Sequence, residues 1–156
     1  MNITMDRRPA SPSQFVQRRL QGPVVCVVDG FDRSLPALRE AVRIAAEDGV
    51  GLTVVYAETS AHCLVSPEGG VWVVDVEELE RSVAERIQRE TRAVPWTQIE
   101  IVRDCAAHAA SRIARECRAA LVLAPASGST LSRILHGDVA RRLRKQTPCP
   151  VLAVRA

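Results

Sequence analysis

The sequence predicts an α/β domain built on one five-stranded, mostly parallel β-sheet with helices on both faces. Short apolar runs alternate along the chain with longer amphipathic segments, which is the order of a strand–helix–strand protein. The run at 24–28 is continuous, as expected for a strand buried on both faces of a parallel sheet, whereas 98–103 alternates in polarity, which is also typical of a strand. The chain has 156 residues, enough for one domain with a proper hydrophobic core.

Five apolar runs are the expected strands. The first is β-branched and stops at Asp29-Gly30, a dipeptide typical of turns. The five runs lie at 24–28, 52–57, 98–103, 121–124 and 151–154. Ligands of such sheets lie beyond the carboxyl ends of the strands, where the strand order reverses. We therefore expect a binding site at the edge where these runs end.

Polar residues mark the expected helix starts. Ser34 is the expected N-cap of the first helix, and Asp104 that of the third. Asp75 begins the second helix, which Pro95 stops. A final amphipathic helix lies between the fourth and fifth strands. We expect 58–74 to be irregular, apart from a short extended piece at 71–74.

The positive charge is concentrated at the N-terminus. Residues 1–22 carry Arg7, Arg8, Arg18 and Arg19 against Asp6, which equals the net charge of +3 for the whole chain. Residues 23–156 are therefore neutral overall. This balance argues against general nucleic-acid binding by the folded body. We interpret 1–22 as a flexible basic extension and 23–156 as the domain.

The cysteines and the apolar runs indicate in which cellular compartment the protein is expected. No apolar run reaches the 18 or so residues that a membrane span needs, and residues 1–20 lack the apolar segment of a secretory signal. A cytoplasmic location is therefore expected. The five cysteines are scattered without a Cys-x-x-Cys pair, which favours buried, reduced thiols: Cys26, Cys63, Cys105, Cys117 and Cys149.

Three segments resemble the universal stress protein family, and the resemblance spans residues 23–156. Residues 27–34 read VVDGFDRS and resemble the family's opening strand and turn. Residues 52–57, LTVVYA, resemble its second strand. The most specific match is SRILHGDVA at 132–140, followed by PCPVLAVR at 148–155. The resemblance implies a Rossmann-like three-layer sandwich and a homodimer formed by pairing the last strands of two subunits.

Many members of that family bind ATP through a glycine pattern: Gly, two residues, Gly, nine residues, then Gly and Ser or Thr. Anchored on Gly137, the pattern places Ala124 first, Ser127 second and Asp138 last. Ala124 lacks glycine's backbone freedom. Beside Ser127, Gly128 supplies flexibility, while the hydroxyls of Ser127, Ser129 and Thr130 supply donors. The resemblance also places Asp29 and Ala57 beside adenine and ribose, so the candidate cleft comprises Asp29, Gly30, Ala57, Ala124, Ser127, Gly128, Ser129, Gly137 and Asp138.

Asp138 is the substitution that argues most against ATP. In the family this position opens the last helix, where free N–H groups would hold the triphosphate. A carboxylate there caps the helix, which contributes about 0.5–2 kcal/mol. It also repels phosphate, at about 4 kcal/mol for unit charges 4 Å apart at a near-surface dielectric. We therefore predict that ATP is not bound tightly.

Other groups of residues have simpler interpretations. Cys105 and His108 lie three apart on one predicted helix and are an alternative zinc pair, but a structural zinc site needs four ligands. The basic run Arg141, Arg142, Arg144 and Lys145 complements a helix dipole, which we prefer to nucleic-acid contact. The chain has no P-loop and no Gly-x-Ser-x-Gly nucleophile motif.

The sequence therefore predicts a cytoplasmic, homodimeric universal-stress-type protein that regulates the stress response, with no enzymatic activity, metal or bound nucleic acid. The expected dimer seam is the last strand, an apolar sheet edge made of Val151, Leu152, Ala153 and Val154. One alternative is an adenine-nucleotide binder with slow ATP hydrolysis. Another is a redox or zinc sensor that uses Cys105 and His108.

Overall fold

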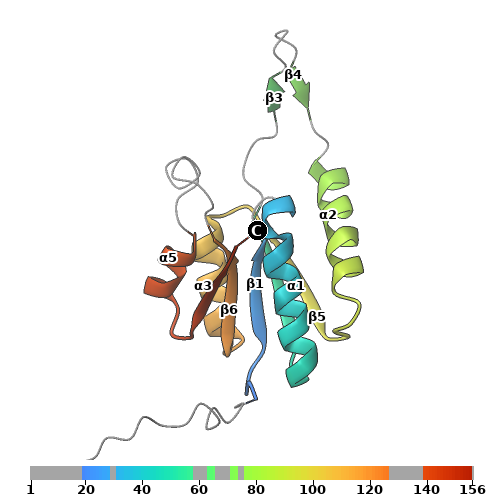
Figure 1. Cartoon of the computed structure of the whole chain (residues 1–156). Coiled ribbons are helices and arrows are strands. Elements are labelled where there is room, and N and C mark those ends of the chain that lie inside the picture. Colours follow the sequence, from blue (N-terminus) through green and yellow to red (C-terminus); the bar gives the residue numbers. More distant parts are fainter. Residues whose placement is uncertain are drawn as a thin grey trace, which may run out of the picture.

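The computed structural model describes residues 19–28, 31–57, 63–65, 71–73, 76–126 and 139–155. The five expected runs form one sheet in the order β5-β2-β1-β6-β7 (Figure 1), and every pairing in it is parallel. The strands are β1 (Val24–Val28), β2 (Leu52–Ala57), β5 (Thr97–Val102), β6 (Leu121–Pro125) and β7 (Val151–Val154). The predicted fold class is confirmed, and no expected strand end is wrong by more than one residue.

Helices cover both faces of the sheet. The helices α1 (Phe31–Asp48) and α2 (Val76–Glu90) pack on one face, whereas α3 (Ala106–Glu116) and α5 (Val139–Gln146) pack on the other (Figure 1). Side chains of β1 alternate between the two resulting cores, because successive residues of a strand point to opposite faces. Cys26 belongs to the core beneath α1, and Val27 belongs to the core beneath α3. This explains why the run at 24–28 is apolar throughout.

Two of the expected helix caps are wrong. The first helix begins at Phe31, so Ser34 lies inside it and is fully buried rather than capping it. The third helix has Cys105 at its N-cap, with no side-chain capping bond. The neighbouring Asp104 accepts the Cys105 N–H at Oδ1, at 2.6 Å. Asp75, the expected start of the second helix, lies outside the described residues.

Two further elements differ from expectation. The second helix ends at Glu90 rather than at Pro95, and the Thr91 hydroxyl donates to the Ile87 carbonyl at 2.9 Å. Residues of the expected irregular stretch form an antiparallel pair, β3 (Cys63–Val65) with β4 (Val71–Val73). The short extended piece near 71–74 is therefore confirmed, while β3 was not expected. Among the described residues, no helix is long and apolar enough to span a membrane.

Helix α3 ends in a Schellman motif that uses arginine instead of glycine. The Ala119 N–H donates to the Ala114 carbonyl at 2.8 Å, and the Arg118 N–H donates to the Arg115 carbonyl at 3.2 Å. The motif requires a left-handed residue, and Arg118 takes that conformation with φ 53°. The motif turns the chain from α3 back toward the sheet, where the Ala120 N–H donates to the Pro23 carbonyl.

Candidate functional site

The carboxyl ends of the strands form the edge at which this fold binds ligands. From β1 the chain passes through α1 to β2 on one side, whereas β6 flanks β1 on the other side. The strand order therefore reverses between β1 and β6, which is the switch point that the sequence argument requires. Ala57 ends β2, and Ala124 is the penultimate residue of β6. Both predicted site residues thus lie near this edge.

Ala124 stands where the family pattern has glycine, yet its backbone conformation is that of an ordinary strand residue. It lies inside the regular ladder opposite Ala153, and its side chain is fully buried in the core beneath α3 and α5. Arg118 is the only non-glycine residue with a positive φ in the described ranges. The backbone at Ala124 therefore needs no glycine, and its methyl group is not exposed to a ligand. Ala57, opposite Val102, is also almost fully buried, at 3% exposure.

The other predicted members of the cleft lie outside the described residues. They are Asp29, Gly30, Ser127, Gly128, Ser129, Gly137 and Asp138. The interpretation of the glycine pattern, with Asp138 as its decisive change, stays a prediction from the sequence.

A thiol at the same edge is exposed, contrary to the expectation of a buried cysteine. Cys105 follows β5 and begins α3, and its pKa is lowered from the ordinary thiol value. The main cause is the backbone N–H of His108 in the first turn of α3, although no capping hydrogen bond of ordinary geometry forms there; the Ala107 N–H and the Arg142 side chain lower the pKa further. Nη1 of Arg142 lies 3.8 Å from Sγ. These donors stabilise the thiolate.

The remaining described thiols behave differently. Cys26 is fully buried, as expected, and burial raises its pKa to about 12. Cys117 and Cys149 are half-buried, and desolvation raises the pKa of each. As for the zinc alternative, the described ranges hold no group of three or more His, Cys, Asp or Glu side chains that could bind a metal ion.

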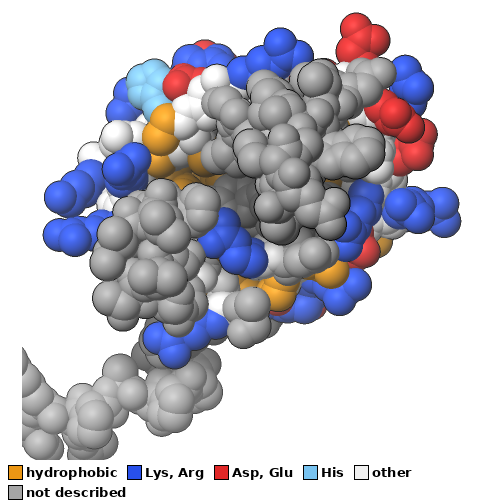
Figure 2. Space-filling view, turned by 90° about the horizontal axis from the view of Figure 1, so that it is seen from above, with side chains coloured by type: hydrophobic (Ala, Val, Ile, Leu, Met, Phe, Trp, Pro, Cys, Tyr) orange, Lys and Arg blue, Asp and Glu red, His pale blue; other side chains and the backbone are white. Residues whose placement is uncertain are grey.

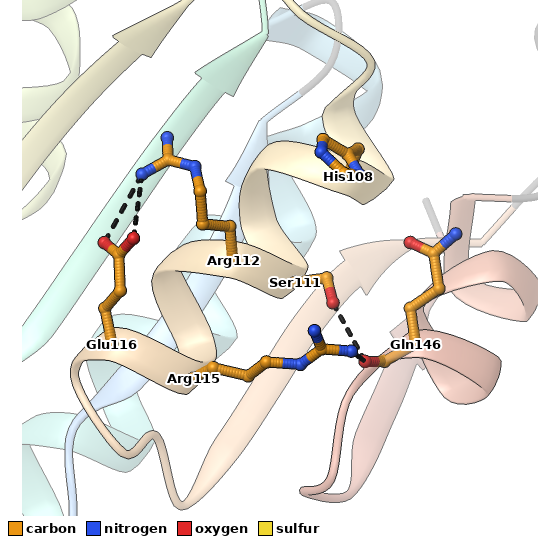
Figure 3. Close-up of a pocket in the computed structure, with 6 residues that line it drawn as sticks. All are labelled: His108, Ser111, Arg112, Arg115, Glu116 and Gln146. Atoms are coloured by element: carbon orange, nitrogen blue, oxygen red, sulfur yellow. Dashed lines mark hydrogen bonds and ion pairs between the residues drawn. The ribbon is translucent and has the colours of Figure 1, made fainter.

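A pocket of about 460 Å³ lies between α3 and the last residue of α5 (Figure 3). It is lined by His108, Ser111, Arg112, Arg115, Glu116 and Gln146. Sequence reasoning missed this pocket. The spacing of His108, Arg112 and Arg115 at i, i+4 and i+7 could have indicated one basic stripe on a helix. Nothing in the sequence, however, shows that Gln146 closes the other side.

Strand β7 forms one edge of the sheet. The carbonyls of Pro150 and Val154 accept bonds from β6, from the Val122 N–H at 3.0 Å and the Ala126 N–H at 2.7 Å. Because bonding residues alternate along a parallel strand, the N–H and C=O groups of Val151 and Ala153 point away from β6. Leu152 is 40% exposed, one of only two large apolar side chains that are exposed in the described part of the molecule.

The fold and its switch point define a class: a three-layer, doubly wound α/β protein. Residues 22–155 match the model of the universal stress protein family. The chain belongs to this family.

One sequence relative and two solved structures illustrate the similarity to this family. The chain is 30% identical over 137 residues to universal stress protein MJ0531 of Methanocaldococcus jannaschii, with 85% of this chain and 81% of that protein covered. A universal stress protein solved in complex with cAMP has a TM-score of 0.67 at 22% identity, covering 86% of this chain and 96% of that chain. One from Archaeoglobus fulgidus in complex with dAMP has a TM-score of 0.56 at 22% identity, covering 87% and 99%. At these identities the two structures show a shared fold.

Proposed function

We propose that this chain is a homodimeric stress-response regulator that acts through its surfaces rather than by catalysis. The edge of β7 carries this proposal. In the described part of the chain, no strand pairs with the outward N–H and C=O groups of Val151 and Ala153, and an unpaired apolar edge favours pairing with another strand. Leu152 adds an exposed apolar side chain to the same strand. In a two-fold arrangement the same strand of a second copy satisfies both features, because such an interface is self-complementary.

The proposal is tested best at Leu152. The side chains of Val151 and Ala153 pack against one core and that of Val154 packs against the other, so charges at these positions would also disturb the fold. In Leu152→Lys, two copies would bring like charges to the two-fold seam, which is unfavourable. The matched control is Gln98→Lys, at an exposed position of β5 on the opposite edge of the sheet.

Light scattering during size-exclusion chromatography gives the mass of each variant. We expect a dimer for the wild type and for Gln98→Lys, and a monomer or a weakened dimer for Leu152→Lys. A wild-type monomer would contradict the proposal. A Leu152→Lys dimer of unchanged strength would also contradict it.

We further propose that tight ATP binding has been lost, and that Asp138 rather than Ala124 is the reason. The buried methyl group and regular strand backbone of Ala124 leave this position compatible with the family's site. Asp138 keeps the two effects argued from the sequence, a capped helix start and repulsion of phosphate. Calorimetric titration with ATP and magnesium should detect no micromolar binding to the wild type. Asp138→Ser should gain affinity, and wild-type binding at micromolar strength would overturn this part of the proposal.

An adenine-nucleotide binder is the second candidate function. It is supported by the complexes of two family members with cAMP and dAMP, and by the fit of Ala124. The same titration with AMP and cAMP tests it. Phosphate release from ATP, measured over hours, tests the slow hydrolase. A signal above that of an Asp29→Ala variant would favour this candidate over the non-enzymatic regulator.

A further inference from the structure

The pocket between α3 and α5 has one wall that is already fixed by protein contacts. Nη1 of Arg112 lies 3.1 Å and 3.3 Å from the two Glu116 carboxylate oxygens (Figure 3). This pair therefore contributes almost no net charge to the pocket. The same two side chains line a smaller neighbouring hollow of about 290 Å³ over β2 and β5, so the pair divides the two spaces.

The opposite wall is fixed by the end of α5. The Gln146 carbonyl accepts a hydrogen bond from the Ser111 hydroxyl at 2.9 Å and another from Arg115. Ser111 is 4% exposed and thus anchors the carbonyl from within the protein. Figure 3 shows Arg115 reaching across from α3 to Gln146, while Arg112 turns toward Glu116. The pocket is therefore preorganised by groups that satisfy one another.

Hydrogen-bond donors remain available in this pocket. Arg115 has five N–H donors, and Gln146 is its one protein acceptor in the described part of the structure. The imidazole of His108 is exposed and has no protein partner among the described residues. It carries at least one N–H in either protonation state. His108 and Arg115 thus supply donors that nothing in the described ranges accepts.

The surrounding charge is strongly positive. Together α3 and α5 carry six cationic side chains and one acidic side chain, a net charge of +5. The opposite layer, α1 and α2, carries six cationic and nine acidic side chains, a net charge of −3. In Figure 2, Lys and Arg side chains lie on both sides, whereas Asp and Glu side chains gather mainly on the side that carries α2. The neutral balance of the domain therefore conceals two opposed faces, and the cationic face concentrates anions around the pocket.

We propose that this pocket binds the phosphate group of a small organic molecule, separately from any site at the carboxyl edge of the sheet. Arg115 supplies a planar fork that matches two phosphate oxygens, whereas His108, about two helical turns away on α3, supplies a donor to the organic part of the ligand. A volume of about 460 Å³ exceeds the needs of phosphate alone and lies within the range of small-molecule sites. The organic part of the ligand would occupy the space beside the Arg112–Glu116 wall.

Geometry favours a small molecule over a nucleic acid or an acidic protein. His108 and Arg115, seven residues apart on α3, both line one concave space, and the bonded pair Ser111 and Gln146 closes one side of it.

Amide chemical-shift titration of the full chain with ribose 5-phosphate tests the proposal. We expect saturable shifts at residues 108–116 and at Gln146, and weaker binding of inorganic phosphate to the same residues. Arg115→Gln should weaken ribose 5-phosphate binding about tenfold or more, because a charge-assisted bidentate contact is lost. Ser111 still holds the Gln146 carbonyl in this variant, so the helix contact should persist. Arg115→Lys keeps the charge without the fork and should give intermediate affinity.

Arg89→Gln, in the last turn of α2, is the matched control and should leave the affinity unchanged. Equal weakening by Arg89→Gln would mean that only net charge matters, and would overturn the proposal. Equal shifts with sodium sulfate, or no saturation, would do the same. Tighter binding of a DNA oligonucleotide, with shifts spread along α5, would assign this face to polyanions instead. Because none of these outcomes depends on β7 or Asp138, the result is independent of the proposed function.

Discussion

Removing the charge of Arg142 should make Cys105 a weaker nucleophile. Arg142 extends from α5 to the start of α3, and its Nη1 lies 3.8 Å from the thiol sulfur. Only the thiolate reacts with alkylating reagents, so the rate follows the fraction of Cys105 that is ionised. Arg142→Gln removes the positive charge but leaves the backbone N–H groups of His108 and Ala107, which also lower the pKa, in place. The pKa of Cys105 should therefore rise toward the ordinary value without reaching it.

The size of this effect follows from the distance. Cys105 is exposed, so a dielectric near that of water applies, and unit charges 3.8 Å apart then interact by about 1 kcal/mol. Since about 1.4 kcal/mol is a factor of ten, the thiolate fraction near neutral pH should fall about fivefold at low salt. Physiological salt screens exposed charges, so the reduction there should be smaller.

Alkylation with iodoacetamide, followed by peptide mass spectrometry, measures this for each cysteine separately. The wild-type rate at Cys105 should rise with pH and level off below the pH at which a free thiol does. The Arg142→Gln profile should move to higher pH, while the control Arg144→Gln, from the same helix, should not. An unchanged profile in Arg142→Gln would refute the electrostatic reasoning.

Three further results are expected. Arg118→Gly should raise the free energy of unfolding by about 1 kcal/mol, because glycine adopts φ 53° without strain; a lower urea midpoint would contradict this. Leu143→Ala should lower the free energy of unfolding by about 2–5 kcal/mol, because the Leu143 side chain of α5 is fully buried in the core shared with α3; a loss below about 1 kcal/mol in urea titrations would show that this core is loosely packed. Cys26 should react with Ellman's reagent only after unfolding. Reaction of the folded protein at pH 8 would contradict this inaccessibility. The pKa of Cys26, about 12, lies above the ordinary 9.0, so the contribution of the buried neutral thiol to stability is present below pH 9.0 and lost as pH rises toward 12.

The sheet could be predicted from the sequence because its signal is local. A continuous apolar run such as 24–28 has few alternatives to a strand buried on both faces. Helix ends were less predictable. Ser34 has the chemistry of an N-cap, yet the helix begins three residues earlier and buries it. Arg118 takes the left-handed position after α3 that glycine usually occupies, so the residue types gave no signal for the end of this helix.

The site was predictable only where the family pattern defines it. Ala57 and Ala124 lie near the expected edge, but burial of the Ala124 side chain depends on packing beneath α3 and α5. The α3–α5 pocket depends on the contact between Ser111 and Gln146, which are 35 residues apart. Arg142, 37 residues away, contributes to the lowered pKa of Cys105, although the largest contribution comes from the nearby His108 N–H. Contacts between residues this far apart in the sequence arise from tertiary structure, so no local sequence pattern predicts them.

Native mass spectrometry of the purified 156-residue chain reports both the assembly and any bound nucleotide in one spectrum. We expect a dimer mass equal to twice the chain mass of 17.0 kDa, without an adenine nucleotide. A monomer at micromolar concentration, or a dimer that retains ATP or AMP, would contradict this expectation.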